Sequence, residues 1–172
     1  NCGGTAVLTH DPGLVSSASH LVIPGVGAFG ECMAKFHARE LVEPVTRAIA
    51  AGAVTLGICV GMQILFEESE EFGSTPGLGL IPGRVTKIPS EGADGERVKV
   101  PNVGWRRLLE PVSGAWEGTL LGNVPKGSHC YFVHSFMGVP NRDENRLADV
   151  LYGGRKICAA VRSGNLFGTQ FH

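Results

Sequence analysis

Residues 56–63, LGICVGMQ, place a cysteine between two glycines in a stretch that carries no charge. Gly57, Cys59 and Gly61 follow the pattern Gly-x-nucleophile-x-Gly, in which the nucleophile sits on a sharp turn between a strand and a helix. The flanking positions need glycine because the neighbouring backbones approach too closely for a Cβ atom. The spacing therefore indicates a cysteine nucleophile, and the chemistry that such a thiol performs is acyl transfer.

The helix that should follow this turn adds an electrostatic argument. We expect it over residues 60–71, with unpaired N–H groups and the positive end of its dipole directed at the thiol. This predicts a lowered pKa for Cys59, and it predicts that the N–H of Val60 faces a developing oxyanion. The competing interpretation is that Cys59 is a small core residue, because free cysteine is among the most buried residue types.

Two other segments favour the chemical interpretation. PGVGAF, residues 24–29, is a second tight glycine loop after a predicted strand, and GTQFH, residues 168–172, ends on His172 after another. A cysteine and a histidine from different strand ends of one sheet, with two backbone donors, give the layout of thiol acyl transfer.

The elements that must position these residues alternate strand, loop, helix, strand, turn and helix. The expected strands are residues 5–9, 20–24 and 53–58. One brief helix is expected to begin near residue 12, and a second to cover residues 41–51, with Pro44 in its first turn. This alternation predicts an α/β fold with a mostly parallel central sheet and flanking helices in a flavodoxin-like, three-layer arrangement. After Gly73, apolar runs punctuated by glycine and proline predict an additional, mostly antiparallel sheet. No linker separates the halves, so we expect residues 1–172 to form a single domain.

Composition excludes several function classes. The 172 residues are 43% hydrophobic and 18% charged, which is enough apolar material for a core without disulfides or metals. A net charge of −1 provides no basic surface for nucleic acid. Residues 48–66 carry no charge and are long enough to cross a bilayer, but three glycines interrupt them. We therefore expect neither a nucleic-acid partner nor a membrane partner.

The cysteines and histidines predict a reducing compartment and no metal. Five widely spaced cysteines, an odd number, suit free thiols in the cytoplasm. The six histidines show no paired ligand spacing, and His129 and His134 point to opposite faces of an expected strand. We expect no metal site and no cofactor.

Six motifs in order, PGVGAF, LGICVGMQ, GLGLIPGRV, VPNVGW, YFVHSF and GTQFH, resemble class I glutamine amidotransferase domains over nearly the whole chain. The resemblance is greatest to glutaminase subunits of imidazole glycerol phosphate synthases. It implies that Cys59 attacks the side-chain amide of glutamine, forms a glutamyl thioester and releases ammonia, with His172 as general base and acid. It also implies a heterodimer, in which a partner cyclase uses the ammonia to make imidazole glycerol phosphate in histidine biosynthesis.

The same resemblance implies roles for other residues. Backbone N–H groups of Val26 and Val60 would hold the oxyanion, and the resemblance leaves open whether the loop of residues 25–27 must flip before it donates. The implied substrate contacts are Gly25, Gly27, Gln63, Tyr131, His134 and Ser135, and the implied partner contacts are Asn102 and Trp105. Each has a plainer interpretation: a turn for the glycines, a cross-link within a helix for Gln63, and core or half-buried packing for the aromatic residues and His134.

The chain also departs from the family pattern. A glutamate normally follows the histidine two residues on, and the family's N-terminal strand is missing, so we expect a chain cut at both ends. In the serine-protease template, loss of the corresponding acid costs about 10⁴-fold in turnover, so this chain should be weak or inactive. Asn102, Arg106 and Arg107 also differ from the residues usual in these subunits. Two alternatives therefore stay open: a paralogue that supplies ammonia to a sugar-modifying synthase in surface polysaccharide biosynthesis, and a non-catalytic partner-binding domain.

Overall fold

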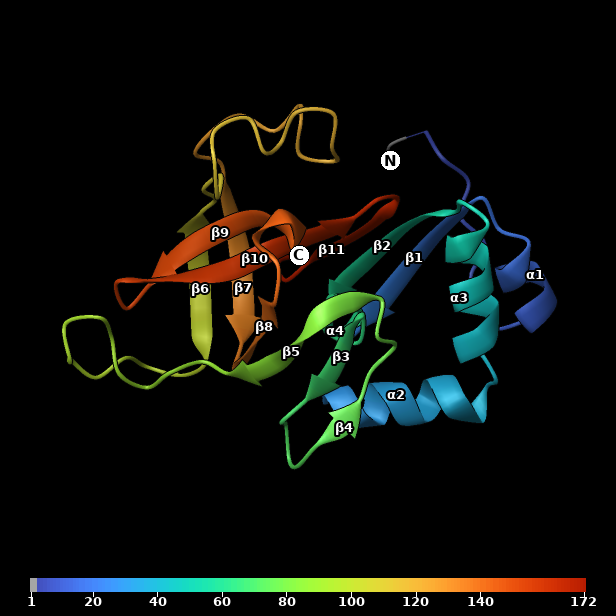
Figure 1. Ribbon diagram of the computed structural model, residues 1–172, viewed down its shortest axis with the longest axis horizontal. Helices are drawn as coiled ribbons and strands as arrows, with labels where there is room; N and C mark the ends of the chain where they lie inside the picture. Colours follow the sequence, from blue (N-terminus) through green and yellow to red (C-terminus); the bar gives the residue numbers. More distant parts are fainter. Residues whose placement is uncertain (1–2) are drawn as a thin grey trace.

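The computed structural model describes residues 3–172, and Cys2 lies outside the described residues. Its centre is a five-stranded sheet with the strand order β1-β2-β11-β10-β9 (Figure 1). The strands are β1 (His20–Gly25), β2 (Val54–Cys59), β9 (Arg146–Tyr152), β10 (Arg155–Ser163) and β11 (Leu166–Thr169). β1, β2 and β11 run parallel, while β10 pairs antiparallel with both β11 and β9. The mostly parallel central sheet expected from the sequence is confirmed for its site-bearing strands.

Helices from the first half of the chain gather beside β1 and β2 (Figure 1). They are α1 (Pro12–Ser16), α2 (Phe29–Ala38), α3 (Val42–Ala50) and the single turn α4 (Val60–Gln63). Their buried side chains form one core cluster with β1, and this cluster includes Val15, Phe29, Met33, Val45 and Ile23. α3 begins one residue later than predicted and carries Pro44 in its first turn, where the missing N–H costs no intrahelical bond. α2 was not predicted, although Phe29 and Met33 have helical spacing.

Two smaller sheets complete the fold. One has the order β4-β3-β5-β8, and the other pairs β6 with β7. Their strands are β3 (Phe66–Ser69), β4 (Thr75–Pro76), β5 (Ile81–Lys87), β6 (Asn102–Arg107), β7 (His129–His134) and β8 (Phe136–Pro140), with a short 3-10 turn, η1 (Asp143–Asn145), before β9. The predicted antiparallel pairing holds for β5–β8, β6–β7 and β9–β10, whereas β3 and β5 are parallel. A second core cluster joins β7 to β9 and β10 through Phe132, Leu147 and Ile157.

The helix predicted over residues 60–71 is wrong beyond its first turn. α4 ends at Gln63, and the chain continues into β3. A longer helix would need the carbonyl groups of Ile64 and Leu65 for its own ladder. Here the Ile64 carbonyl accepts from the N–H of Leu78, and the Leu65 carbonyl accepts from Leu80 and Ile81, at 2.8–2.9 Å. Partners more than ten residues away therefore take the bonds that the helix required.

The strand predicted over residues 5–9 is also absent, since this segment joins no described sheet. Val7 and Leu8 are 73% and 99% exposed. Among the described residues β1 pairs with β2 alone, so no neighbouring strand holds residues 5–9 in a ladder. Propensity without a pairing partner does not make a strand, because the backbone groups gain nothing over water.

The uncharged stretch over residues 48–66 divides among α3, β2, α4 and β3. No helix within residues 3–172 combines the length and hydropathy needed to span a bilayer. Of the three glycines in this stretch, Gly52 lies between α3 and β2, while Gly57 and Gly61 lie inside β2 and α4.

Cys158 provides a test of packing in the central sheet. The thiol is fully buried in β10, where Sγ donates to the carbonyl of Ala160 at 3.3 Å, and burial raises its pKa to about 12. The native state thus holds this proton more tightly than the unfolded chain does. The associated stability is present in full below the unfolded thiol pKa of about 8.5 and is lost as the pH rises toward the native value.

We expect the Cys158→Ala variant to lose less unfolding free energy between about pH 8.5 and pH 11 than the wild type does, because the raised thiol pKa is gone. Urea unfolding at a series of pH values measures this difference. Val161→Ala leaves a comparable apolar deletion without removing a thiol, so its profile should run parallel to that of the wild type. Parallel profiles for wild type and Cys158→Ala would contradict the assignment.

Candidate active site

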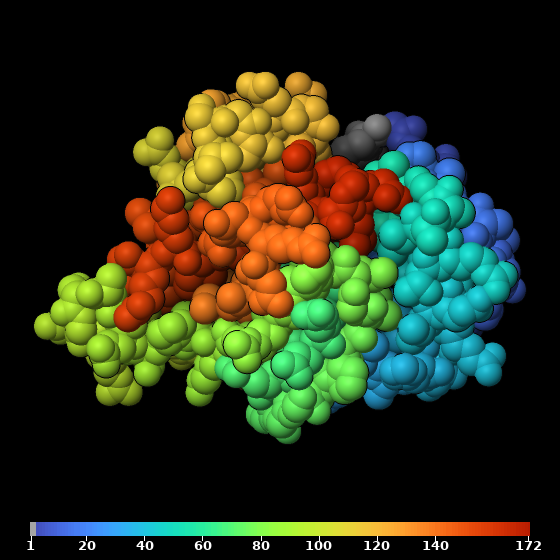
Figure 2. Space-filling model, in the orientation of Figure 1, coloured from blue at the N-terminus to red at the C-terminus, as the bar shows by residue number. Residues whose placement is uncertain are grey.

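The register of the central sheet brings three segments to one edge. Gly25 of β1 lies opposite Cys59 of β2, and Thr169 of β11 lies opposite Ile58. The loop after β1, the turn after β2 and the residues after β11 therefore meet at the carboxyl ends of parallel strands, where α/β folds place their sites. The space-filling view shows the C-terminal residues, in red, between the early segments and the later sheets (Figure 2).

The turn at Cys59 has the strained geometry of the predicted nucleophile elbow. Cys59 has φ +57° and ψ −114°, a region that non-glycine residues rarely adopt. A Cβ atom at Gly57 would lie 2.4 Å from the carbonyl oxygen of Gly61, and one at Gly61 would lie 1.9 Å from that of Ile23. Only glycine fits either position. The same is true of Gly25, whose Cβ would lie 2.4 Å from the nitrogen of Gly61.

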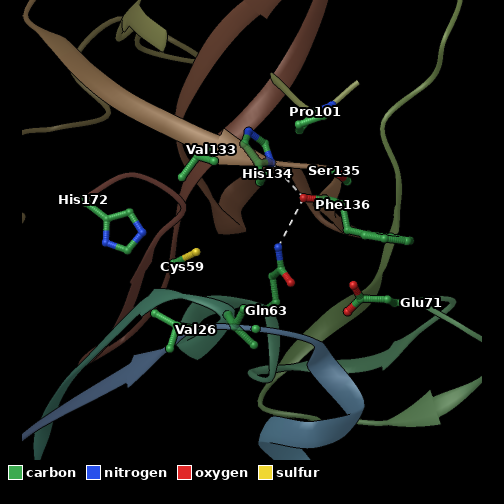
Figure 3. Close-up of a pocket in the computed structure, with 12 residues that line it drawn as sticks. Val26, Cys59, Gln63, Glu71, Pro101, Val133, His134, Ser135, Phe136 and His172 are labelled. Atoms are coloured by element: carbon green, nitrogen blue, oxygen red, sulfur yellow. Dashed lines mark hydrogen bonds between the residues drawn. The ribbon is translucent and has the colours of Figure 1, made fainter. Parts of the chain in front are cut away.

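A pocket of about 350 Å³ lies over this turn, a volume suited to a small ligand such as an amino acid. Both Cys59 and His172 line it. Figure 3 shows these two side chains toward one end of the pocket and Glu71 toward the other, with Gln63 between. The sequence-predicted residues that line the pocket are Val26, Gly27, Cys59, Val60, Gln63, His134, Ser135 and His172.

Gly25 and Tyr131 do not belong to this lining. Gly25 instead permits the close approach of β1 to the turn after Cys59. Tyr131 packs edge-on against Trp105, with ring centroids 5.8 Å apart, and both rings are exposed, by 37% and 66%. The substrate role expected for these two residues stays a prediction.

Asn102 also differs from its predicted place at a partner surface, because it is completely buried. Its side chain lies between Arg106 and His134, in the ladder that pairs Asn102 with His134 across β6 and β7. An asparagine without exposed surface cannot contact a partner directly. Trp105 stays the prediction for that role.

Burial dominates the electrostatics of the nucleophile. It raises the pKa of Cys59, against smaller lowering effects from the N–H of Val60 and the side chain of Gln170. The lowered pKa that we predicted from a helix dipole is thus wrong, because α4 is a single turn with little dipole to offer. A thiol that keeps its proton needs a base nearby, and His172 lines the same pocket.

Hydrogen bonds fix the tautomer of the other histidine in the pocket. Arg106 Nε can only donate, and its contact of 3.0 Å with Asn102 Oδ1 leaves the asparagine NH₂ to face His134 Nε2 at 3.1 Å. His134 therefore accepts at Nε2 and donates from Nδ1 to the carbonyl of Phe136 at 2.8 Å. Burial lowers the pKa of His134, consistent with this neutral ring. Both nitrogens are engaged, so His134 is not available as the base.

Two polar residues of the site escaped the sequence analysis, as did the lining residues Pro101, Val133 and Phe136. Glu71, expected at the end of a helix, lines the pocket, and its Oε2 accepts from the N–H of Phe29 at 2.7 Å, which caps the start of α2. Gln170 is 1% exposed, and its amide lies between Gln63 and Cys59. A polar residue in the apolar run LFGTQF was the available signal for Gln170; nothing local distinguishes Glu71 from the three other glutamates within residues 67–71.

Residues 3–172 contain no group of three His, Cys, Asp or Glu side chains placed to hold an ion.

We expect Gly61→Ala to destabilise the protein by about 3 kcal/mol, since the added Cβ would overlap the backbone of β1. Gly30→Ala is the matched control, because a Cβ there meets only ordinary contacts inside α2. Alanine at that helical position should stabilise by up to ~1 kcal/mol. Thermal and urea unfolding measure both variants. Equal stability of Gly61→Ala and wild type would show that the two backbones are not in contact in solution.

Comparison with known proteins places the chain among glutamine-dependent enzymes. The family model described as Glutamine amidotransferase class-I matches residues 9–172. The imidazole glycerol phosphate synthase subunit HisH 1 of Legionella pneumophila (strain Lens) is 44% identical over 166 residues, which cover 96% of this chain and 78% of the relative. The HisH subunit of Syntrophotalea carbinolica is 43% identical over 172 residues, 99% of this chain and 81% of the relative.

Solved structures agree on the fold. A crystal structure of a glutamine amidotransferase superposes with a TM-score of 0.63 at 20% identity, covering 95% of this chain and 75% of that one. A second glutamine amidotransferase, from Thermotoga maritima, gives a TM-score of 0.58 at 16% identity, covering 90% and 55%.

Proposed function

The chain belongs to the class I glutamine amidotransferase family, and on that premise we propose that it is the glutaminase subunit of an imidazole glycerol phosphate synthase. The observation that carries this proposal is the elbow cysteine and the C-terminal histidine in the lining of one amino-acid-sized pocket. Because the relatives are HisH subunits of imidazole glycerol phosphate synthases, we assign the chain to histidine biosynthesis.

The reaction begins with the protonated thiol. His172 takes the proton of Cys59, and the sulfur attacks the side-chain carbonyl carbon of glutamine, which places a negative charge on the amide oxygen. We assign this oxyanion to the N–H groups of Val60 and Val26, because both residues line the pocket. The imidazolium returns its proton to the leaving nitrogen, and ammonia departs. Water activated by His172 then hydrolyses the thioester, which releases glutamate and restores the thiol.

The far end of the pocket suits the amino-acid part of the substrate. Gln63 uses both hydrogens of Nε2, one toward the carbonyl of Phe136 at 3.2 Å and one toward Gln170 at 2.9 Å. Only its oxygen is left for a ligand, so a ligand group there must donate. The Glu71 carboxylate lines the same region, and together these acceptors favour the ammonium group of glutamine. Ser135 also lines this pocket.

The face beside the pocket suits a partner. Val103, Trp105, Tyr131 and Val133 are exposed on β6 and β7, and we call them the β6–β7 face. Val133 also lines the pocket, so the apolar surface begins at the rim of the site. Contiguous exposed apolar side chains mark interaction surfaces. We place the cyclase here, where it would receive ammonia as it leaves Cys59.

We further infer one domain, since strands from both halves of the chain share the central sheet. The four described cysteines are free, which supports a cytoplasmic enzyme.

A glutamine-mimicking chloroketone should label Cys59 in the intact protein and spare the other four cysteines, because Cys59 alone among the described cysteines lines the amino-acid-sized pocket. Peptide mass spectrometry locates the adduct. Cys59→Ser should abolish both labelling and ammonia release. Modification of another cysteine with Cys59 untouched would remove the catalytic assignment.

Trp105→Ala should lower glutamine-dependent synthesis of imidazole glycerol phosphate at least tenfold while leaving synthesis from added ammonia unchanged, because the partner loses an aromatic contact at the rim. Leu14→Ala, an exposed apolar truncation on α1, is the control and should match the wild type. A chain that supports a sugar-aminating synthase and not the cyclase would overturn the choice of partner while keeping the glutaminase chemistry.

A further inference from the structure

One buried amide reaches the reacting sulfur. Gln170 Nε2 lies 3.6 Å from Cys59 Sγ, and the backbone N–H of Gln170 donates to the carbonyl of Ala159 at 2.9 Å. The β2–β11 register explains the contact. Because Thr169 lies opposite Ile58, the residues that follow them, Gln170 and Cys59, lie beside each other. The position of the amide is thus set by the central sheet.

The orientation of this amide follows from a carbonyl group on β8. The oxygen of Phe136 can only accept, so Gln63 presents its NH₂ group to it, as the dashed line in Figure 3 shows. The same NH₂ group lies 2.9 Å from Gln170, which must therefore present its oxygen. The NH₂ group of Gln170 is then the end that faces the sulfur of Cys59.

A donor in this position acts on the charged form of the nucleophile. An N–H group bonds more strongly to a thiolate than to a neutral thiol, and the bond gains strength in a buried site. Burial of Cys59 works in the opposite direction, because it disfavours the charge that must form when the proton leaves. The donors recorded at this sulfur are the N–H of Val60 and the amide of Gln170.

We propose that Gln170 is a further catalytic residue, whose amide N–H stabilises the Cys59 thiolate in an orientation imposed by Gln63. The role of Gln170 in turnover rests on the proposed glutaminase function. Its effect on the Cys59 thiolate is independent of that function. Gln63 then has two tasks, since it orients Gln170 with its nitrogen and faces the ligand with its oxygen.

The test is the pH dependence of Cys59 alkylation by iodoacetamide in the intact protein, with adducts located by peptide mass spectrometry. Gln170→Met keeps the length of the side chain and removes the donor, so the rate at neutral pH should fall about tenfold, as for the loss of one hydrogen bond to a charged atom. The curve of alkylation rate against pH should move to higher pH and reach the same maximal rate as in the wild type. The other titratable groups in the pocket lining, Glu71, His134 and His172, are unchanged in this variant.

Gln170→Glu should move the profile further in the same direction, because a carboxylate opposes a negative sulfur. Thr169→Val is the matched control: the Thr169 hydroxyl bonds to the carbonyl of Phe171 and not to the sulfur, so its profile should equal that of the wild type. If neither Gln170 variant folds, Gln63→Met removes the group that orients Gln170 and should give a smaller shift. Profiles that superimpose, or that differ by one constant factor at every pH, overturn the proposal.

Glutaminase assays with the partner separate this proposal from the function on which it rests. Gln170→Met should lower kcat about tenfold with little change in KM, because the lost bond acts on the nucleophile and not on bound glutamine. Full kcat in this variant overturns the role of Gln170 and leaves the glutaminase standing. If the alkylation profile of Gln170→Met is shifted but the intact protein releases no ammonia in the presence of its partner, the glutaminase is refuted and the effect on the sulfur is retained.

Discussion

The close approach of three backbone segments at Gly25, Gly57 and Gly61 is the constraint on which the site depends. At each position an added Cβ atom would lie within 2.4 Å of another segment's backbone. This contact presses the turn after β2 against the end of β1 and holds Cys59 in its strained conformation. The nucleophile therefore points into the pocket because the sheet below it leaves no other path for the chain.

The buried position of Cys59 gives the surrounding groups distinct tasks. Burial keeps the thiol protonated, so the site needs a base as well as donors to the sulfur. His134 is held as a neutral acceptor by Asn102, which leaves His172 for proton transfer. The carbonyl of Phe136 orients the amide of Gln63, and Gln63 orients the amide of Gln170 so that its NH₂ group faces the sulfur. A single chain of hydrogen bonds thus connects β8 with the reacting atom.

The site also connects with the surface through β6 and β7. Alternate residues on β7 face opposite ways, so Phe132 enters the second core cluster while Tyr131 and Val133 stay exposed. Arg106 bonds to buried Asn102 and also lies over the ring of Tyr152, 5.0 Å from its centroid. Val133 belongs both to the exposed face and to the pocket lining, so the face and the pocket meet on this pair of strands.

The sequence by itself determined the family motifs and the elbow, because Gly57, Cys59 and Gly61 form one local pattern. The contact with Ile23 of β1 that makes glycine necessary at Gly61 is tertiary. The sequence also indicated β1 and β2 as parallel strands, whereas β11, expected among the antiparallel runs after Gly73, joins the central sheet parallel to β2. Tertiary structure decided the rest: residues 78–81 ended the helix after Gln63, and the lack of a neighbouring strand left residues 5–9 unpaired. Gln170 meets Gln63 and Cys59 across separations of 107 and 111 residues, and Glu71 caps a helix 42 residues earlier. Contacts of that range depend on where the sheet places each strand end, and no local pattern of residues encodes them.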